Sequence, residues 1–236
     1  SGEWLYPDEV EKIDQETFIK KKDKSKVIVG PPESMSKSKK NTVDPETMIK
    51  QFGADSVRWF ILSDSPPEKD IQWSDAGVVS SNKFLQKIWN LNNILLHRSE
   101  KNGNQIIINN FNSEIDNLIK KIDKTIEEFR FNVTIAHFYE TYNLFNRFLD
   151  KEITNDCFLK NIKKIMILLI PFTPHLANEC LELLGCKEID NWPEIKENFD
   201  ENIKFAVQIN GKTRDIISVK KNSEKDQIEL IVKKNS

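Results

Sequence analysis

Apolar residues recur at intervals of three and four along most of the chain between residues 74 and 185. The first stripe consists of Phe84, Ile88, Leu91 and Leu95, behind a favourable N-cap at Ser74. Further stripes predict helices over about 112–129, 132–150 and 154–170, and from Pro174 to Gly185. Five amphipathic helices joined by short polar turns are typical of a helical bundle.

The stripes also predict which side chains form the core. The second helix is expected to bury Ile115, Leu118, Ile119, Ile122, Ile126 and Phe129. The third is expected to bury Val133, Ala136, Tyr139, Leu144, Phe145 and Phe148. Aromatic side chains here could stack on RNA bases, but at helical spacing we expect them in the core.

Two short helices are predicted before the bundle, over about 45–52 and 54–63. Asp44 is a favourable N-cap for the first, Pro45 suits its first position, and Gly53 suits its end.

The second of these short helices has its predicted apolar face at Val57, Phe60 and Ile61. Arg58 and Trp59 fall outside that face.

A β-hairpin is predicted near the C-terminus. Residues 204–209 alternate between apolar and polar, Asn210-Gly211 suits a type I′ turn, and residues 213–219 form the returning strand. Ser223 would cap a short helix over about 224–234. A hairpin with one helix is marginally stable alone in water.

The composition is that of an ordinary water-soluble chain, with 31% charged and 38% hydrophobic residues and a net charge of −2. No apolar run approaches the roughly eighteen residues of a membrane span. Any nucleic-acid site must therefore be a local patch, and lysines gather at positions 20, 21, 22, 24, 26, 37, 39 and 40. We interpret the first five as a solvated loop.

The cysteines and histidines give no pattern of metal ligands. Cys157, Cys180 and Cys186 lack zinc-site or CxxC spacing, and none of the three histidines has a second ligand at metal spacing. We therefore predict no metal site, and sparse reduced thiols favour the cytoplasm. The opening Ser1-Gly2 reads as the start of an excised segment.

Candidate chemistry lies in the loop before the first short helix. The apolar run 27–29 leads into Gly30-Pro31-Pro32, and small hydroxyls and amines follow in residues 34–40. Ammonium groups and hydroxyls on a loop of low bulk suit a polyanion such as a nucleotide phosphate. The alternative is a solvated basic loop.

The order of residues resembles a known family. Met35-Ser36-Lys37-Ser38 resembles the KMSKS signature of class I aminoacyl-tRNA synthetases, and the similarity continues through Phe52–Asp55, Ser65–Asp70 and Trp73–Gly77. The last two blocks favour leucyl-tRNA synthetases, whereas the isoleucyl and valyl enzymes share the loop and the Gly-Ala-Asp helix. A colinear set over about sixty positions is far more specific than a four-residue loop.

The resemblance implies a mainly α fold in three parts. Residues 1–73 would end a catalytic domain and carry the KMSKS-like loop and stem-contact helices. Residues 74–200 would form the anticodon-binding-type helical bundle, and residues 201–236 a partial, truncated α/β C-terminal domain.

The activity implied is that of a leucine–tRNA ligase. With ATP and Mg²⁺ the family activates leucine to leucyl-adenylate, then esterifies the 3′ end of tRNA(Leu). Lys37 would be catalytic, by meeting the charge that builds on pyrophosphate. Residues that would bind ATP are Ser34, Met35, Ser36, Lys37 and Ser38.

The loop departs from the family pattern at two positions. The family usually has lysine at Ser34 and a small residue at Lys40. The lost lysine would weaken ATP binding unless Lys39 or Lys40 substitutes for it.

Three basic residues are candidate tRNA contacts. Arg58 would touch the acceptor stem or form an exposed ion pair. Lys212 and Arg214 would contact phosphates or serve only to solubilise the hairpin turn.

The resemblance also implies absences and alternatives. We find no His-Ile-Gly-His-like motif and no editing domain, so we expect the 236 residues alone to be inactive, and the protein to be monomeric and not membrane-bound. The alternatives are an isoleucyl- or valyl-tRNA synthetase fragment, or a non-catalytic tRNA-binding module.

Overall fold

The computed structural model describes residues 3–14, 17–186, 191–193, 195, 202–209 and 212–220, with six further positions between 223 and 232. The chain divides into two compact units, Ser1–Pro193 and Glu194–Ser236, which we describe separately.

The first unit begins with a small antiparallel sheet that the sequence did not predict. A 3₁₀ turn, η1 (Pro7–Glu9), precedes β1 (Val10–Lys12), β2 (Phe18–Lys20) and β3 (Lys26–Val27), in the order β1-β2-β3. The apolar run 27–29 enters this sheet only through Val27, which pairs with Phe18. Ile28 is 91% exposed, so most of the run is not buried.

Helix α1 (Pro45–Phe52) has the ends that the sequence predicts. The side chain of Asp44 accepts hydrogen bonds from the backbone N–H groups of Glu46 and Thr47. Gly53 ends the helix at φ 80°, a conformation that favours glycine.

Helix α2 (Ala54–Asp64) exists as predicted, but its predicted apolar face is only partly correct: Phe60 is buried and Ile61 is not. Trp59 is fully buried, whereas Ile61 is 42% exposed. The reason is that α2 contacts α3, α5 and α7, so its buried residues spread over a wide arc.

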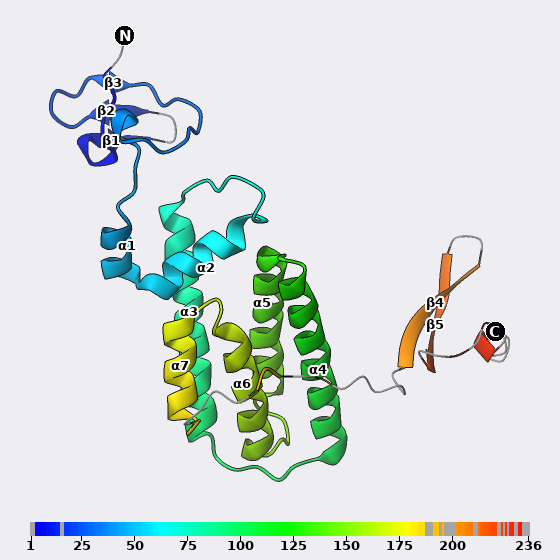
Figure 1. Ribbon diagram of the computed structural model, residues 1–236. Coiled ribbons are helices and arrows are strands. Elements are labelled where there is room, and N and C mark those ends of the chain that lie inside the picture. Colours follow the sequence, from blue (N-terminus) through cyan, green and yellow to red (C-terminus); the bar gives the residue numbers. More distant parts are fainter. Residues whose placement is uncertain are drawn as a thin grey trace. The chain divides into compact units, whose positions relative to one another are not determined.

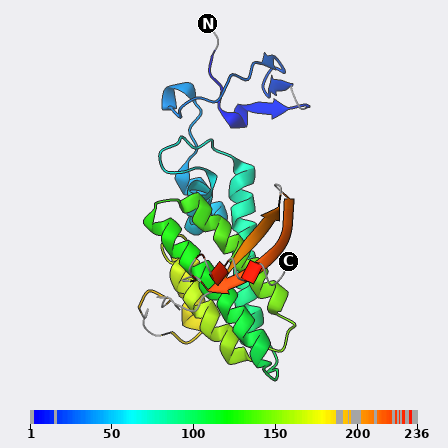
Figure 2. The same ribbon diagram turned by 90° about the vertical axis from the view of Figure 1, so that its right-hand side faces the viewer.

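The five predicted bundle helices are all present (Figures 1 and 2), and the predicted mainly α fold is confirmed. They are α3 (Asp75–His97), α4 (Gln105–Glu127), α5 (Phe131–Phe148), α6 (Asn155–Leu169) and α7 (Pro174–Leu183). The predicted stripe of α3 is buried throughout. None of the described helices is long and apolar enough to cross a membrane.

Helix α4 begins earlier than predicted. Asn104 caps it by accepting from the N–H groups of Ile106 and Ile107. Polar residues after this first turn interrupt the apolar stripe, so the sequence pattern did not predict the turn. At the other end Phe129 lies beyond the helix, 65% exposed and at φ 55°, so its predicted burial is wrong.

The predicted face of α5 is correct in its second half only. Ile135 and Phe138 are buried near its start, whereas Ala136 and Tyr139 are exposed. The first half of α5 packs against both α2 and α4, and the ring of Phe138 lies 5.9 Å from that of Trp59. A second neighbour therefore rotates the buried face away from the predicted stripe.

The second unit contains the predicted hairpin, β4 (Asn202–Ile209) and β5 (Lys212–Lys220). The strands are antiparallel, and their register shifts between Val207 and Gln208. Ile217 and Val219 are buried. The predicted turn residues Asn210 and Gly211 lie outside the described residues, and positions 225, 227, 228, 231 and 232 are helical.

Candidate functional site

The loop of residues 34–41 is closed by its own polar groups. The N–H of Ser36 donates to Oδ1 of Asn41 (2.7 Å), and Nδ2 of Asn41 donates to the carbonyl of Ser34 (3.3 Å). The hydroxyl oxygens of Ser36 and Ser38 lie 2.7 Å apart. Sequence reasoning gave Asn41 no role, although asparagine side chains commonly bind nearby backbone in turns.

A short 3₁₀ turn, η2 (Lys37–Lys39), holds the lysines of this loop. It ends at Lys40, which has φ 51° and lies over the ring of Tyr6 at 5.0 Å.

The three loop lysines differ in their partners. Lys39 pairs with Glu33, and Nζ of Lys40 lies 3.9 Å from Glu3. Lys37 is exposed, and its ammonium group has no ion pair or hydrogen-bond partner within the described part of the chain. Lys37 is thus the loop lysine whose ammonium group can meet a phosphate without first breaking an ion pair.

Arg58 is exposed, but it forms no ion pair with any residue that the structure describes. Its Nη2 donates to the carbonyl of Pro171 (2.7 Å) and its Nε to that of Phe172 (3.3 Å). The guanidinium therefore holds the turn between α6 and α7 and retains Nη1 for an external anion.

Sequence reasoning missed Asp55, which is buried beside Arg58 on α2. Its carboxylate accepts from the backbone N–H of Leu176 (2.7 Å) and lies 3.0 Å from Nδ1 of His175. No local signal reveals this, because the partners are 120 and 121 residues away.

The block Trp73–Gly77, which favoured the leucyl subgroup, has a structural position at the start of α3. Nε1 of Trp73 donates to Asp75 (2.8 Å), and its ring lies 5.3 Å from that of Phe60. The side chain of Ser74 caps α3 by accepting from the N–H of Gly77. This block therefore fixes the start of the bundle against α2.

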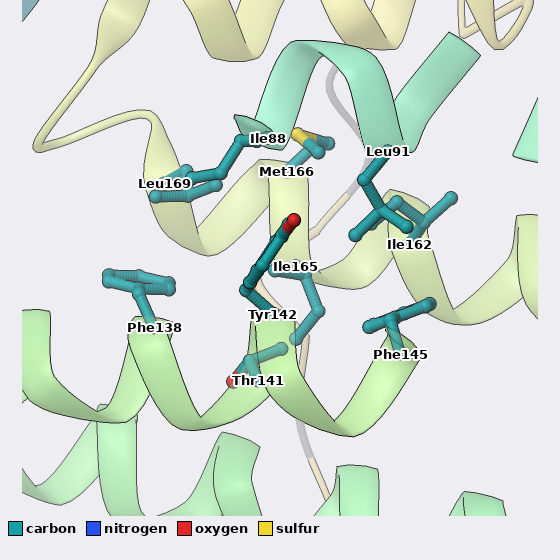
Figure 3. Close-up of a pocket in the computed structure, with 10 residues that line it drawn as sticks. All are labelled: Ile88, Leu91, Phe138, Thr141, Tyr142, Phe145, Ile162, Ile165, Met166 and Leu169. Atoms are coloured by element: carbon teal, nitrogen blue, oxygen red, sulfur yellow. The ribbon is translucent and has the colours of Figure 1, made fainter. Parts of the chain in front are cut away.

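A pocket between α3, α5 and α6 belongs to the core (Figure 3). It is lined by Ile88, Leu91, Phe138, Thr141, Tyr142, Phe145, Ile162, Ile165, Met166 and Leu169. The hydroxyl of Thr141 donates to the carbonyl of His137, so it is already satisfied. The lining is almost wholly apolar, and Tyr142 is its only titratable residue.

Two predicted site residues lie in the second unit. Lys212 and Arg214 lie on β5, but their side chains are outside the described residues. Among the described residues no cluster of three or more histidine, cysteine, aspartate or glutamate side chains could hold a metal ion.

Comparison with known proteins defines the class. Residues 109–230 match the family model described as the anticodon-binding domain of tRNA ligase, and residues 27–74 match that of tRNA synthetases class I (I, L, M and V). The first match alone covers more than half of the chain, so the chain belongs to the family of tRNA ligases with this anticodon-binding domain.

Within that class the chain is similar to leucine–tRNA ligases, as the sequence predicted. It is 36% identical to the leucine–tRNA ligase of Hyphomonas neptunium over 98% of this chain and 28% of that protein. It is also 36% identical to that of Rickettsia bellii, over 97% of this chain and 28% of that protein. The chain thus spans little more than a quarter of the length of these relatives.

Solved structures agree with this assignment. A ternary complex of Agrobacterium radiobacter K84 agnB2 LeuRS with tRNA and LeuAMS matches 84% of this chain and 27% of that chain, with a TM-score of 0.71 and 27% identity. The apo form of Mycobacterium tuberculosis methionyl-tRNA synthetase matches 61% of this chain and 35% of that chain, with a TM-score of 0.53 and 18% identity. This match shows a shared fold.

Proposed function

We propose that this chain is part of a leucine–tRNA ligase, which activates leucine with ATP and transfers it to the 3′ end of tRNA(Leu). The observation that carries the proposal is the loop Met35–Ser38, because its central lysine is exposed and unpaired among the described residues. Similarity to leucine–tRNA ligases along nearly the whole chain supports leucine as the substrate.

Lys37 is the proposed catalytic residue of this loop. When the leucine carboxylate attacks the α-phosphorus of ATP, negative charge builds on the departing pyrophosphate. An ammonium group that reaches this charge in the transition state lowers the barrier more than it strengthens substrate binding.

The loop fits the triphosphate of ATP better than it fits Mg²⁺. Ser34, Ser36 and Ser38 supply hydroxyls, and the nearby carboxylate of Glu33 pairs with Lys39. Magnesium prefers free oxygen ligands such as carboxylates, so we assign none of these residues to it. Lys39 and Lys40 would replace the family lysine at Ser34 only after leaving Glu33 and Glu3.

Arg58, Lys212 and Arg214 are the proposed tRNA contacts. Nη1 of Arg58, which bonds to none of the described residues, supports a phosphate contact there. For the other two, the support is the basic character of the hairpin at that position. We retain the division into a catalytic end (1–73), a bundle (74–200) and a C-terminal part (201–236) as part of the proposal.

We further propose a monomeric enzyme of the cytoplasm. Its three cysteines are free, and Cys157 and Cys180 are buried in the bundle core, which suits a reducing compartment.

The test is ATP–pyrophosphate exchange by the tRNA ligase that carries this chain, with leucine, isoleucine, valine and methionine. We expect exchange with leucine, and a loss of about 10²- to 10³-fold in Lys37→Ala. The matched control is Lys50→Ala, another exposed lysine, which should retain full exchange because its pair with Glu46 is a surface pair. Exchange with a different amino acid would replace leucine as the substrate, and no exchange at all would favour a non-catalytic tRNA-binding module.

A further inference from the structure

Helix α7 has no N-terminal cap of its own. The N-cap residue Thr173 makes no side-chain capping bond, and its hydroxyl donates instead to the carbonyl of Leu169 (3.4 Å). Pro174 occupies the first helical position and has no N–H. The first N–H groups that need an acceptor are therefore those of His175 and Leu176.

Asp55 of α2 supplies the missing cap. Its Oδ2 accepts from the N–H of Leu176 (2.7 Å), and its Oδ1 accepts from the N–H of His175 (3.4 Å). The Asp55 residue is only 8% exposed. A negative charge at a helix N-terminus is favourable, because the free N–H groups there carry partial positive charge.

Arg58 holds the other side of the same turn. It follows Asp55 by three positions, so the two side chains project from one face of α2. Its guanidinium donates to the carbonyls of Pro171 and Phe172, which directly precede Thr173. The carboxylate of Asp55 thus binds N–H groups at the start of α7, and the guanidinium of Arg58 binds carbonyl groups of the turn that precedes it.

Asp55 and Arg58 lie about one helical turn apart on α2. Their hydrogen bonds therefore fix the rotation of α2 about its axis as well as its position. Helix α1 contacts α2 and α3, and residues 42–44 connect it to the candidate nucleotide loop of residues 34–41. Any rotation of α2 would be passed to α1, which joins that loop to the bundle.

We propose that Asp55 and Arg58 are positioning residues that fix the orientation of the α1–α2 segment on the α6–α7 turn, and so align the nucleotide loop with tRNA held by the bundle. The alignment with tRNA rests on the proposed function, whereas the fixed orientation does not.

The orientation is tested by hydrogen–deuterium exchange in the tRNA ligase that carries this chain. In Asp55→Asn and Arg58→Ala we expect amides of residues 45–64 and of Leu176 to exchange about tenfold faster, while those of α4 keep their rates. Asp64→Asn, an exposed acid on the same helix, is the matched control and should change nothing. Equal acceleration in α4 would mean a merely structural role, and no acceleration in 45–64 would mean that the pair fixes nothing; either result overturns the proposal.

The alignment is tested by comparing two reactions of Asp55→Asn. We expect leucine-dependent ATP–pyrophosphate exchange to remain within about twofold of wild type, while kcat for tRNA charging falls by about tenfold to a hundredfold. An equal fall in both reactions, or unchanged charging, would overturn the alignment. If the wild-type ligase shows no leucine-dependent ATP–pyrophosphate exchange, the proposed function is refuted. Hydrogen–deuterium exchange would still test the orientation of the α1–α2 segment.

Discussion

At the scale of single residues, two buried asparagines of the bundle have opposite surroundings. Asn92 on α3 is fully buried, and neither Oδ1 nor Nδ2 has a hydrogen-bond partner among the described residues. Asn161 on α6 is 2% exposed, and its Nδ2 donates to Oδ1 of Asn112 (2.7 Å) and to the carbonyl of Cys157 (2.9 Å).

This contrast gives the first prediction. Asn92→Leu should raise the free energy of unfolding by about 1–3 kcal/mol, because it removes two unpaired buried polar atoms at similar volume. Asn161→Leu should lower it by about 1 kcal/mol, because it removes hydrogen bonds that are made. Urea unfolding of both variants is the measurement, and equal destabilisation by the two would contradict the prediction.

The three cysteines should differ in their reaction with iodoacetamide. Burial raises the pKa of the Cys180 thiol to about 12, with a smaller contribution from Glu179, and burial also raises the pKa of Cys157. Because the thiolate is the nucleophile, both thiols stay protonated and unreactive at pH 8. Mass spectrometry should find Cys186, which is partly exposed, alkylated first, and all three alkylated in urea. Early alkylation of Cys180 in the folded protein would show that the thiol is accessible.

At the scale of elements, Arg98 ties the end of α3 to the end of α5. Its guanidinium donates to the carbonyls of Leu149, Lys151 and Ile153 and to Oδ1 of Asn155. Its guanidinium carbon also lies 4.9 Å from the centre of the Phe158 ring.

Arg98→Ala should therefore lower the free energy of unfolding by about 2–3 kcal/mol, since charge-assisted hydrogen bonds at a helix end are lost together. Arg147→Ala is the matched control: that side chain is exposed and pairs with Glu114, so its loss should change stability by less than about 1 kcal/mol. Thermal and urea unfolding would both report the difference. Similar losses in the two variants would argue against the role of Arg98.

A close approach between α2 and α3 gives another prediction. A Cβ at Gly77 would overlap Cε2 of Phe60 and lie 2.7 Å from Cδ2 of the same ring. Gly77→Ala should therefore destabilise the protein by about 1–3 kcal/mol through overpacking. Gly30→Ala is the control, because a Cβ there meets no atom within 4 Å. An unchanged unfolding midpoint in Gly77→Ala would mean that the Phe60 ring moves aside freely.

Several helix starts were predictable from the sequence, whereas the start of α4 was not, and helix faces were only partly so. Asp44, Ser74 and Pro174 mark helix starts through local chemistry, and the structure has those starts. The faces of α2 and α5 depend on several neighbours at once, so a single apolar stripe misplaced Trp59 and Tyr139.

The candidate site divides in the same way. The loop Ser34–Ser38 was found from its order of residues, but the ion pairs of Lys39 with Glu33 and of Lys40 with Glu3 were not. Among the described residues these pairs distinguish both lysines from the side chain of Lys37. Asp55 was not found at all, because a side chain that caps a helix 120 residues later has no local pattern.

At the scale of the whole molecule, the two compact units should respond separately to core substitutions. Ile217 is buried in the second unit, and Ile115 is buried in the bundle. Ile217→Ala should speed amide exchange in β4 and β5 but leave the unfolding midpoint of the bundle unchanged, because a hairpin has few apolar contacts to lose. Ile115→Ala should lower the bundle midpoint, because it should lower the free energy of unfolding by about 2–5 kcal/mol. A bundle midpoint that follows Ile217→Ala would mean that the units unfold together.

The cap that Asp55 provides for α7 bears on where this protein can be cut. One family match ends at residue 74 and the other begins at residue 109. A bundle cut out between these positions would lack Asp55, so the N–H groups of His175 and Leu176 at the start of α7 would lose their acceptor. A fragment that keeps this cap has to start before Asp55, within the stretch that matches class I tRNA synthetases. The match to the anticodon-binding domain therefore begins later in the chain than the contacts that hold the start of α7.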